Sequence, residues 1–516
     1  MGNSRTRNSA LTMISSGVRQ ILTVLLTFVS RTVFIHTLGA DYLGLNGLFS
    51  NILSLLALSE LGIGSAISFY LYKPIADKDI HRIRVLMNFY KTCYRIVGLS
   101  ILGIGMCLVP FLPKLVNLEQ QVPVNLYLVY FLYLLNTASS YLFFAYKQAI
   151  VTANQEQYKI EKINIVFTFV NCAVDIVILL LFHNYIVYLF LKFLLVLVKN
   201  LIIALIIDRE YPYLQGKETE KITKEEIHIF LKDILSVSLF RIGSTLFNST
   251  DNIIISMLLG TVVVGYYSNY CMIISQITIA IVILTRSFVA GIGNVIAKET
   301  KEKQYIIFKQ LDFVVFFVTT FCTACLFQLL NSFVKLWIAG VDSAYLLSQT
   351  VVLFLCLSFF LDSTTQILNS FREGSGNFKT GRTLQIIGGI VNIFLSIVLG
   401  KAYGLEGIFA ATIIGKLFIT VSPFVMGASK DVFGFSRFKL LKRYYLNMFV
   451  MVLVLAVNWI LCRPFHMNGL SNFIVECLIS CIVPILLLLI LYGRTDEMKS
   501  LIERAKLIKN KLLKKG

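Results

Sequence analysis

Apolar runs long enough to cross a bilayer follow one another along the whole 516-residue chain. Of its residues, 57% are apolar and only 15% are charged, against roughly 45–50% and about 25% in a soluble domain. A transmembrane helix needs about 20 mostly apolar residues. The pattern predicts an all-α polytopic membrane protein with about fourteen transmembrane helices. Their approximate bounds are 9–37, 44–72, 85–112, 122–147, 162–183, 185–208, 228–258, 264–296, 304–334, 345–370, 381–400, 404–427, 442–462 and 469–492.

The polar stretches are too short to form a catalytic domain. The longest one inside the chain, 208–226, has 19 residues, whereas a folded domain needs about 50 or more. The five histidines are scattered without the spacing of metal ligands. Cys322 and Cys325 form a CxxC motif inside an apolar run with no histidine nearby, which favours helix packing over redox or metal chemistry. We therefore expect no enzyme, no bound metal and no cofactor.

The net charge of +19 is explained by membrane topology better than by nucleic-acid binding, because the cations lie mostly in short loops between apolar runs. With the N-terminus placed in the cytoplasm, the cytoplasmic segments carry 33 Lys and Arg, whereas the opposite loops carry 4. Cationic loops resist translocation across a membrane. The asymmetry predicts that both termini are cytoplasmic, that the lipid bilayer is a partner and that nucleic acid is not.

Both ends of the chain carry further topological information. The N-terminal run contains Arg19 and Arg31 and lacks a short apolar core with a cleavage site, so we expect a retained first helix instead of a cleaved signal peptide. The tail, 493–516, places Met498 and Leu501 with other apolar residues at helical spacing, opposite a lysine-rich face. This pattern predicts an amphipathic helix on the anionic inner leaflet, with a solvated basic tail as the alternative.

Short sequence matches recur at an offset of about 221 residues. The pairs are Leu38-Gly39 with Leu259-Gly260, Gly44 with Gly265, Lys114-Leu115 with Lys335-Leu336, and Val170-Asn171 with Val391-Asn392, while Arg19 and Arg241 differ by 222. The matches predict two six-helix lobes in the same orientation plus two C-terminal helices, and substrate sites of such transporters lie between the repeats. The expected parts are an N-terminal lobe (1–208), a cytoplasmic linker (209–227), a C-terminal lobe (228–427), helices 13 and 14 (428–492) and the tail (493–516).

The first and seventh spans, which the repeat relates, each carry a polar stripe with arginine. At 100° per residue, the stripe residues fall within about 60° of one direction. They are Thr12, Ser16, Arg19, Gln20, Thr23, Thr27, Ser30 and Arg31 in the first span, and Ser238, Arg241, Ser244, Thr245, Asn248, Asn252 and Ser256 in the seventh. Ionisable groups within a membrane usually face a bundle interior or a watery cavity, so we infer one central cavity lined by both stripes. Polar helix packing is the alternative, and it explains the hydroxyls better than the arginines.

Other ionisable residues within the spans set the charge of this cavity. Glu60, Asp251 and Arg286 are assigned to this cavity together with the stripes. Three further carboxylates lie in other spans, namely Asp175, Asp312 and Asp362. The lysines within spans are interpreted as snorkelling towards the interface; they are Lys192, Lys199 and Lys416. Four arginines, Arg19, Arg31, Arg241 and Arg286, outnumber the carboxylates of Glu60 and Asp251. The cavity is therefore expected to be cationic and to suit an anionic cargo, because guanidinium groups bind phosphate oxygens in pairs.

Two segments carry a resemblance to a known family. They read SRTVFIHTLGADYLGLNGLFSNILSLLALSELGIGSAI and STDNIIISMLLGTVVVGYYSNY. Together with fourteen spans in two six-helix halves, they resemble the flippases that export repeat units of O-antigen, capsule and exopolysaccharide. These flippases belong to the multidrug/oligosaccharidyl-lipid/polysaccharide exporter (MOP) superfamily. The likeness extends over essentially the whole chain and rests on pattern, without a catalytic signature.

The resemblance implies a function, a location and partners. The cargo would be an undecaprenyl-pyrophosphate-linked oligosaccharide, flipped between leaflets of a bacterial cytoplasmic membrane by alternating access. Arg19, Arg31, Arg241 and Arg286 would bind pyrophosphate or acidic sugar, with Glu60 and Asp251 as gate or ion-coupling groups. Coupling to a proton or sodium gradient is left open. Helices 13 and 14 would form a groove for the lipid tail, and a polysaccharide polymerase and glycosyltransferases would be partners.

Four alternatives remain at this point. A lipid II flippase shares the lipid-linked pyrophosphate chemistry of the cargo. A drug/cation antiporter of the same superfamily would favour acidic residues, whereas arginines dominate the two stripes. A membrane enzyme, such as a repeat-unit polymerase, would need a sizeable loop outside the bilayer, and a scaffold would not need so many ionisable residues inside it.

Overall fold

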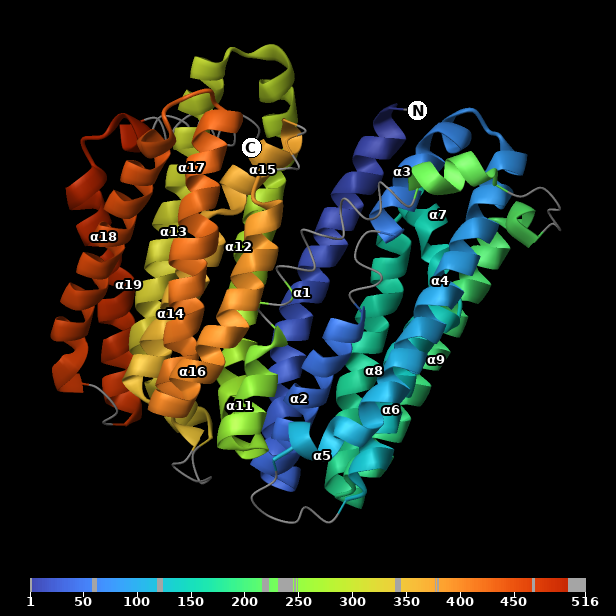
Figure 1. Ribbon diagram of the computed structural model, residues 1–516, viewed down its shortest axis with the longest axis horizontal. Coiled ribbons are helices and arrows are strands. Elements are labelled where there is room, and N and C mark those ends of the chain that lie inside the picture. The colour runs from blue at the N-terminus through green and yellow to red at the C-terminus, as the bar shows by residue number, and fades with distance from the viewer. Residues whose placement is uncertain are drawn as a thin grey trace, which may run out of the picture. The chain divides into compact units, whose positions relative to one another are not determined.

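The computed structural model describes residues 2–57, 63–117, 124–215, 222–230, 245, 247, 249–338, 345–375, 377, 380–465 and 469–499. Its regular structure over these ranges is helical, as the sequence predicts (Figure 1). The chain forms two compact units, Met1–Gly265 and Tyr266–Gly516, which are described separately. The lobe boundaries expected at 208 and 228 stay a prediction.

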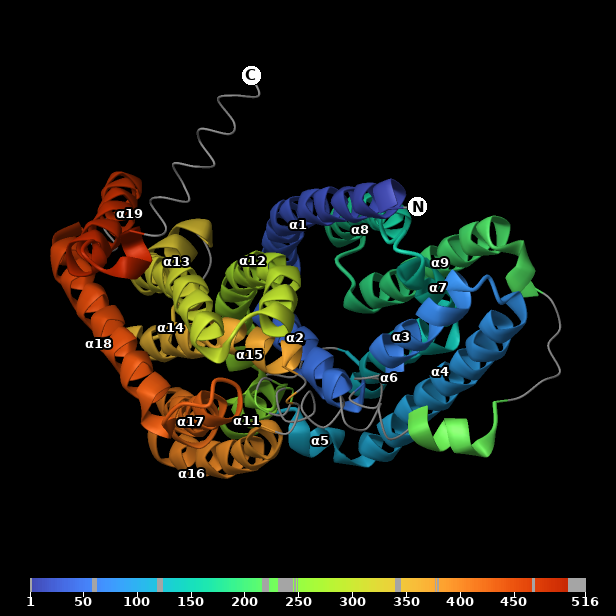
Figure 2. The ribbon, with the colours of Figure 1, turned by 90° about the horizontal axis from the view of Figure 1, so that it is seen from above.

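The first unit is built around long helices that pack side by side. α1 runs along α8, α6 packs against α4 and α9, and α2 contacts α6 and α11 (Figure 2). The helices are α1 (Gly2–Leu38), α2 (Ala40–Leu56), α3 (Ile63–Ala76), α4 (Ile80–Leu108), η2 (Val109–Phe111), α5 (Leu112–Leu115), α6 (Leu126–Leu142), η3 (Ala145–Lys147), α7 (Gln148–Ala153), α8 (Tyr158–Phe182), α9 (Tyr185–Glu210), η4 (Pro212–Gln215) and α11 (Asp251–Leu259). α12 (Thr261–Lys298) begins in this unit and continues in the second.

The tight connection expected between the fifth and sixth spans is present. His183 has a left-handed backbone, with φ of +46°, and ends α8. The side chain of Asn184 then accepts hydrogen bonds from the backbone N–H groups of Ile186 and Val187, which begin α9. Asn125 caps α6 in the same way. Asparagine is suited to this position because its side-chain oxygen satisfies N–H groups that lack a partner in the first helical turn.

The second unit is centred on α13, which packs against α14, α18 and α19. A cluster of buried apolar side chains, including Phe313, Phe316, Phe360 and Met451, fills the space between these helices and includes Met498 of the tail. The helices are α13 (Lys301–Trp337), α14 (Gln349–Thr364), α15 (Gln366–Gly374), α16 (Arg382–Ile414), the π-helix η6 (Gly415–Val421), α17 (Ser422–Asp431), α18 (Arg437–Cys462), η7 (Arg463–Phe465) and α19 (Leu470–Tyr492).

The described residues contain ten helices long and apolar enough to cross a membrane, or eleven with the bent pair Leu126–Leu142 and Ala145–Ala153. The chain is thus an all-α polytopic membrane protein. Three of the expected fourteen spans, 44–72, 122–147 and 228–258, include residues outside the described ranges. Thr383–Asp431 counts as one helix although Gly404, with φ of +62° and ψ of −137°, interrupts it where spans 381–400 and 404–427 were expected to separate.

The repeated Leu-Gly pairs break two helices in the same way. Gly39 lies between α1 and α2 with φ of +84°, and Gly260 lies between α11 and α12 with φ of +100°. A side chain is strained at these angles, whereas glycine adopts them readily. The two Leu-Gly pairs, which stand 221 residues apart, therefore both end a helix at a glycine with positive φ. This agreement supports the predicted repeat.

The segments that follow these breaks pack reciprocally within the first unit. A Cβ atom added to Gly44 would lie 1.9 Å from the carbonyl oxygen of Thr261, and one added to Gly265 would lie 2.4 Å from that of Ala40. Thr261 and Gly265 stand 221 residues after Ala40 and Gly44. The same close approach of helix backbones is thus made twice, with the roles of the two segments exchanged.

Candidate functional site

The polar stripe of α1 lies opposite an exposed apolar face. Ile14, Val18, Ile21, Leu25 and Val29 recur at helical spacing and keep 45–64% of their surface exposed. The stripe itself is half-buried and turns towards α8, the helix with which α1 makes its longest contact. The structure therefore separates a face of α1 suited to lipid from a face that holds charged and hydroxyl groups.

The first group of charges on this face is the Arg19 cluster, formed by Arg19 of α1, Glu161 of α8 and Lys199 of α9. The Arg19 Nε donates to the Glu161 Oε2 over 2.5 Å. The Arg19 side chain keeps 34% of its surface exposed, whereas that of Glu161 keeps 9%. Lys199 is half-buried and close enough to Arg19 for their charges to interact. The cluster thus contains two cations and one carboxylate.

A second group, the Arg31 cluster, repeats this composition further along the same helices. The Lys192 ammonium of α9 lies 2.5 Å from the Asp175 carboxylate of α8 and also donates to the Asn171 Oδ1 over 3.3 Å. Ser30 of α1 hydrogen-bonds the same Asp175 carboxylate. Arg31 follows Ser30 in α1, and its charge and that of Asp175 both act on Tyr188, so we count it in the cluster. Asp175 is 5% exposed, so its charge is compensated inside the unit.

Tyrosines surround Arg31. Its charge acts on the hydroxyl groups of Tyr133 and Tyr188, and the Tyr188 ring lies 5.5 Å from the Lys192 ammonium. The Tyr133 hydroxyl is 3.1 Å from that of Tyr185. Arg31 is half-buried among these groups. Cations, hydroxyl donors and aromatic rings are therefore concentrated at this point of the first unit.

The two clusters form a candidate anion site with two levels. At each level α1 supplies an arginine, α8 a carboxylate and α9 a lysine, leaving a formal charge of +1. Arg19 and Arg31 are 12 residues apart, which corresponds to about 18 Å along a helix. Because each carboxylate is more buried than its cationic partner, the cations are the accessible part of each pair.

The other predicted residues of the first stripe lie beside these clusters. Ser16, Gln20, Thr23 and Thr27 are all half-buried on α1. Thr12, at the start of the stripe, accepts a hydrogen bond from the backbone N–H of Tyr158 at the start of α8. Part of the stripe is thus helix packing, and that the remainder lines an aqueous cavity stays a prediction.

The second predicted stripe is described only in part. Ser238, Arg241, Ser244 and Asn248, together with Glu60 of the second span, lie outside the described residues. Thr245 is half-buried, and Asp251 and Asn252 are 5% and 9% exposed at the start of α11. At the far end of that stripe, Ser256 donates to the carbonyl oxygen of Leu115 over 2.8 Å, which is a packing contact. Arg286 is exposed on α12 in the second unit.

The interpretation of Lys192 and Lys416 as snorkelling residues is wrong. Lys416 is 5% exposed and lies 2.6 Å from the Asp362 carboxylate, in the same kind of pair that Lys192 makes with Asp175. A carboxylate on a neighbouring helix compensates each ammonium within the fold, so neither needs to reach the membrane surface. The residues on both sides of each lysine are apolar, so the local sequence did not indicate which carboxylate would pair with it.

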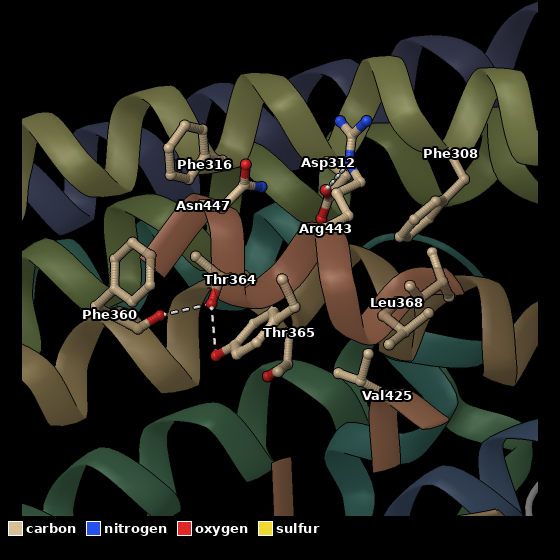
Figure 3. A pocket seen from close by; sticks show the side chains of 12 residues that line it. Phe308, Asp312, Phe316, Phe360, Thr364, Thr365, Leu368, Val425, Arg443 and Asn447 are labelled. Carbon is tan, nitrogen blue, oxygen red and sulfur yellow. Dashed lines mark hydrogen bonds and ion pairs between the residues drawn. The ribbon is translucent and has the colours of Figure 1, made fainter. Parts of the chain in front are cut away.

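The second unit contains a small pocket of about 30 Å³ (Figure 3). Its wall is mostly apolar, but the Asp312 carboxylate and the Arg443 guanidinium face each other in it, 3.5 Å apart. The lining residues are Phe308, Asp312, Phe316, Phe360, Thr364, Thr365, Leu368, Val425, Leu440, Arg443, Tyr444 and Asn447. The sequence gave no sign of this pocket, because its walls come from α13, α14, α15, α17 and α18.

The beginning of the tail contacts the ion pair of Asp312 and Arg443. The Arg443 guanidinium donates to the Glu497 Oε1 over 2.8 Å, and Met498 is 5% exposed in the apolar cluster. Partial burial of Glu497 opposes its ionisation, but the hydrogen bond from Arg443 outweighs this and holds the pKa of Glu497 below its usual range. The remaining tail from residue 500, expected to be amphipathic, lies outside the described residues.

The CxxC motif lies in a helix contact. The Cys325 thiol of α13 donates to the carbonyl oxygen of Ser480 in α19 over 3.2 Å. Among the described residues, no group of three or more His, Cys, Asp or Glu side chains is arranged to hold a metal ion.

Comparisons with known proteins relate the chain to others by its fold. No family model and no curated protein matches the sequence. Among solved structures, the lipid II flippase MurJ in an inward closed conformation has a TM-score of 0.65 and 15% identity, covering 94% of this chain and 99% of its own. An inward-facing multidrug resistance transporter of the MATE family has a TM-score of 0.64 and 14% identity, covering 79% and 94%.

A third structure, a MOP superfamily transporter from Pyrococcus furiosus, has a TM-score of 0.55 and 15% identity, covering 83% of this chain and 95% of its own. These structural neighbours are transporters, not enzymes. The chain therefore has the fold of the MOP superfamily.

Proposed function

We propose that this protein flips undecaprenyl-pyrophosphate-linked oligosaccharide repeat units from the inner to the outer leaflet of a bacterial cytoplasmic membrane, for capsule, O-antigen or exopolysaccharide assembly. Both termini are cytoplasmic, and the cargo crosses by alternating access. The observation that carries the proposal is the pair of two-cation, one-carboxylate clusters on α1, α8 and α9.

The clusters suit a phosphate-containing cargo for a physical reason. A phosphate group near Arg19 or Arg31 meets a cation that is partly buried, so less of its hydration is lost on binding. Guanidinium groups bind phosphate through two parallel hydrogen bonds, which adds geometric specificity to charge attraction. The carboxylates of Glu161 and Asp175 keep the arginine and lysine ordered when no cargo is bound, which lowers the entropy lost on binding.

The polar part of the cargo also needs such a path. Pyrophosphate and sugars are costly to place in hydrocarbon, whereas a polyprenyl chain is not. Among the tyrosines near Arg31, Tyr188 is half-buried beside Lys192 and offers a ring of the kind that contacts sugars, whereas Tyr133 and Tyr185 are buried. Arg241, Arg286, Glu60 and Asp251 retain their proposed roles in substrate binding and gating, and a polysaccharide polymerase and glycosyltransferases remain the proposed partners.

Lipid II flipping is the second candidate function. The match to MurJ covers 94% of this chain, against 79% for the first MATE transporter, and thus extends further over the chain. Lipid II presents the same lipid-linked pyrophosphate to the clusters, so the fold and the charges do not separate the two cargoes. A drug/cation antiporter is disfavoured, because the net positive charge of both clusters repels organic cations. The Pyrococcus furiosus transporter, described with a binding pocket of reverse polarity, shows that pocket polarity varies on this fold.

A reconstituted transport assay tests the proposal. Purified protein is placed in liposomes with a lipid-linked oligosaccharide, lipid II or a cationic dye, and the arrival of each at the opposite leaflet or lumen is followed. We expect movement of the oligosaccharide lipid and none of the dye. Transport of lipid II alone would identify the second candidate, and transport of the dye alone would refute an anionic cargo.

A further inference from the structure

One exposed face of α4 changes from polar to apolar at Arg95. Its polar part, nearer the start of the helix, consists of Asn88, Thr92 and Arg95. Its apolar part includes Ile96, Leu99 and Met106, which keep 53–61% of their surface exposed. At 100° per residue these side chains fall on one side of the helix. Such an exposed apolar row suits lipid chains, so Arg95 lies where the lipid-facing surface of α4 begins.

The length of the uncharged run places Arg95 at the boundary of the hydrocarbon. The 18 residues from 96 to 113, between Arg95 and Lys114, include no charged side chain. At 1.5 Å per residue they span about 27 Å, which matches a hydrocarbon core of about 30 Å. With the termini in the cytoplasm, as proposed above, Arg95 therefore lies at the level of the phosphate groups of the inner leaflet.

A broken span brings a second segment to the same level. The 21 residues from 126 to 146 carry no charge, and Lys147 follows them. The span bends by 40° between α6 and η3, where Phe144 has a left-handed backbone with φ of +63°. This conformation is costly for a bulky residue, and it persists only where the surrounding structure holds it. Because η3 contacts both α4 and α9, the break fixes Tyr146 and Lys147 beside α4.

We call Lys91, Arg95, Tyr146 and Lys147 the Arg95 patch. The Lys91 ammonium lies 5.9 Å from the centre of the Tyr146 ring, and the charge of Arg95 acts on the Tyr146 hydroxyl. Lys91 and Tyr146 are half-buried, whereas Arg95 is exposed. The patch therefore combines two cations of α4 with a hydroxyl group of η3.

The charges of this patch are not balanced by protein carboxylates. The Lys147 ammonium lies 2.6 and 2.5 Å from the two carboxylate oxygens of Asp208, which compensates that lysine. Among the described residues, neither Lys91 nor Arg95 forms an ion pair with a carboxylate. The Arg19 cluster differs, because Glu161 lies against its arginine. Two positive charges of the Arg95 patch are thus open to an anion from the membrane.

We propose that the Arg95 patch binds an anionic phospholipid of the inner leaflet. Arg95 and Lys91 hold the phosphodiester, the Tyr146 hydroxyl contacts the headgroup, and an acyl chain lies along the apolar row of α4. Guanidinium groups bind phosphate through paired hydrogen bonds. Basic pockets between transmembrane helices on the cytoplasmic side are also a known kind of site for anionic lipid headgroups.

The position of the patch favours a phospholipid over the cargo. The patch belongs to α4 and η3, whereas the Arg19 and Arg31 clusters belong to α1, α8 and α9. It opens onto the exposed face of α4, so a lipid reaches it from the bilayer without entering the unit. A zwitterionic lipid is disfavoured, because its own cation is repelled by Lys91 and Arg95. The inference uses the proposed topology and does not depend on what the cargo is.

Native mass spectrometry of the full-length protein tests the proposal. The protein is released, without cargo, from nanodiscs that contain phosphatidylglycerol and phosphatidylcholine, and the lipids that stay bound are identified and titrated. We expect the wild type to retain phosphatidylglycerol in preference to phosphatidylcholine. Lys91→Gln/Arg95→Gln should bind phosphatidylglycerol at least about tenfold more weakly, which is the effect of losing one charged hydrogen bond.

The matched control is Lys78→Gln/Lys224→Gln, which removes two exposed cations of the same unit and changes the net charge equally. It should bind phosphatidylglycerol like the wild type. Equal binding by the wild type and by Lys91→Gln/Arg95→Gln would overturn the proposal, and so would equal retention of the two lipids by the wild type. If the double variant does not fold, Arg95→Gln alone, at an exposed site, should still weaken binding.

A further titration separates the phospholipid from other phosphate compounds. Undecaprenyl pyrophosphate and inorganic phosphate are each added to the protein with phosphatidylglycerol bound. We expect neither to displace the phospholipid at equal concentration. Displacement by undecaprenyl pyrophosphate that is lost in Lys91→Gln/Arg95→Gln would assign the patch to the cargo and overturn the proposal. Since the lipid-binding measurement involves no transport, its failure and that of the transport assay are distinguishable.

Discussion

The guanidinium of Arg19 lies 2.5 Å from the carboxylate of Glu161, across the contact between α1 and α8. The pair has two roles in our account, because it joins two helices and also presents a cation beside a buried carboxylate. A variant that removes only one partner changes both roles at once. The first prediction separates the structural role from the transport role.

Arg19→Ala should destabilise the protein more than the double variant Arg19→Ala/Glu161→Gln. The single variant leaves the Glu161 carboxylate, 9% exposed, without its cation. Breaking a fully buried pair costs roughly 3–5 kcal/mol, and we expect about 2 kcal/mol here because Arg19 is partly exposed. Thermal unfolding in detergent measures the difference. Lys162→Ala, which removes an exposed cation of α8, is the control. Equal losses in the single and double variants would show that the pair is not a structural contact.

Gly44→Ala and Gly265→Ala should each destabilise the fold by about 1–3 kcal/mol, the usual cost of overpacking. Their added Cβ atoms would lie 1.9 Å and 2.4 Å from backbone carbonyl oxygens, which cannot move aside as a flexible side chain can. Gly103→Ala is the matched control, because an added Cβ there meets no atom within 4 Å. A denaturation series in detergent measures all three. Unfolding of Gly44→Ala like that of Gly103→Ala would contradict the close approach.

Glu497→Gln should lower stability at neutral pH but not in acid. The Arg443–Glu497 hydrogen bond holds the pKa of Glu497 below its usual range, so its stabilisation is present above the unfolded-state pKa, about 4.3, and is lost as the pH falls through the lower folded-state value. The effect should be about 1 kcal/mol, since the pair is partly exposed. Unfolding temperatures of the two proteins as a function of pH test this. Glu302→Gln, at an exposed site, should show no such difference.

The apolar pattern predicted most of the fold because span length and alternation are imposed by the bilayer. The turn at His183 and Asn184, the breaks at Gly39 and Gly260, and the exposed face of α1 all agree with local sequence. Local patterns do not encode which helix covers a given face. Arg19 was predicted on the polar stripe, whereas its partner Glu161, 142 residues away, was not.

The same limit explains the ion pairs of the second unit. Asp312, Asp362 and Lys416 stood out as charges within apolar runs, but their pairing depends on how α13, α14, η6 and α18 pack. A lysine that snorkels and a lysine that meets an aspartate on another helix have the same surroundings in sequence. The pocket at Arg443 is built entirely from such long-range contacts.

The most direct test of the central claim uses the double variant Arg19→Ala/Glu161→Gln in the reconstituted transport assay with lipid-linked oligosaccharide. The variant removes one cation and one carboxylate, so the Arg19 cluster keeps its formal charge of +1 on Lys199 while losing the guanidinium. We predict that it inserts and folds but moves the oligosaccharide lipid at least about tenfold more slowly, since one lost charged hydrogen bond is worth roughly 1.5–3 kcal/mol. Transport at the wild-type rate by the folded double variant would contradict a role of this arginine in carrying the cargo.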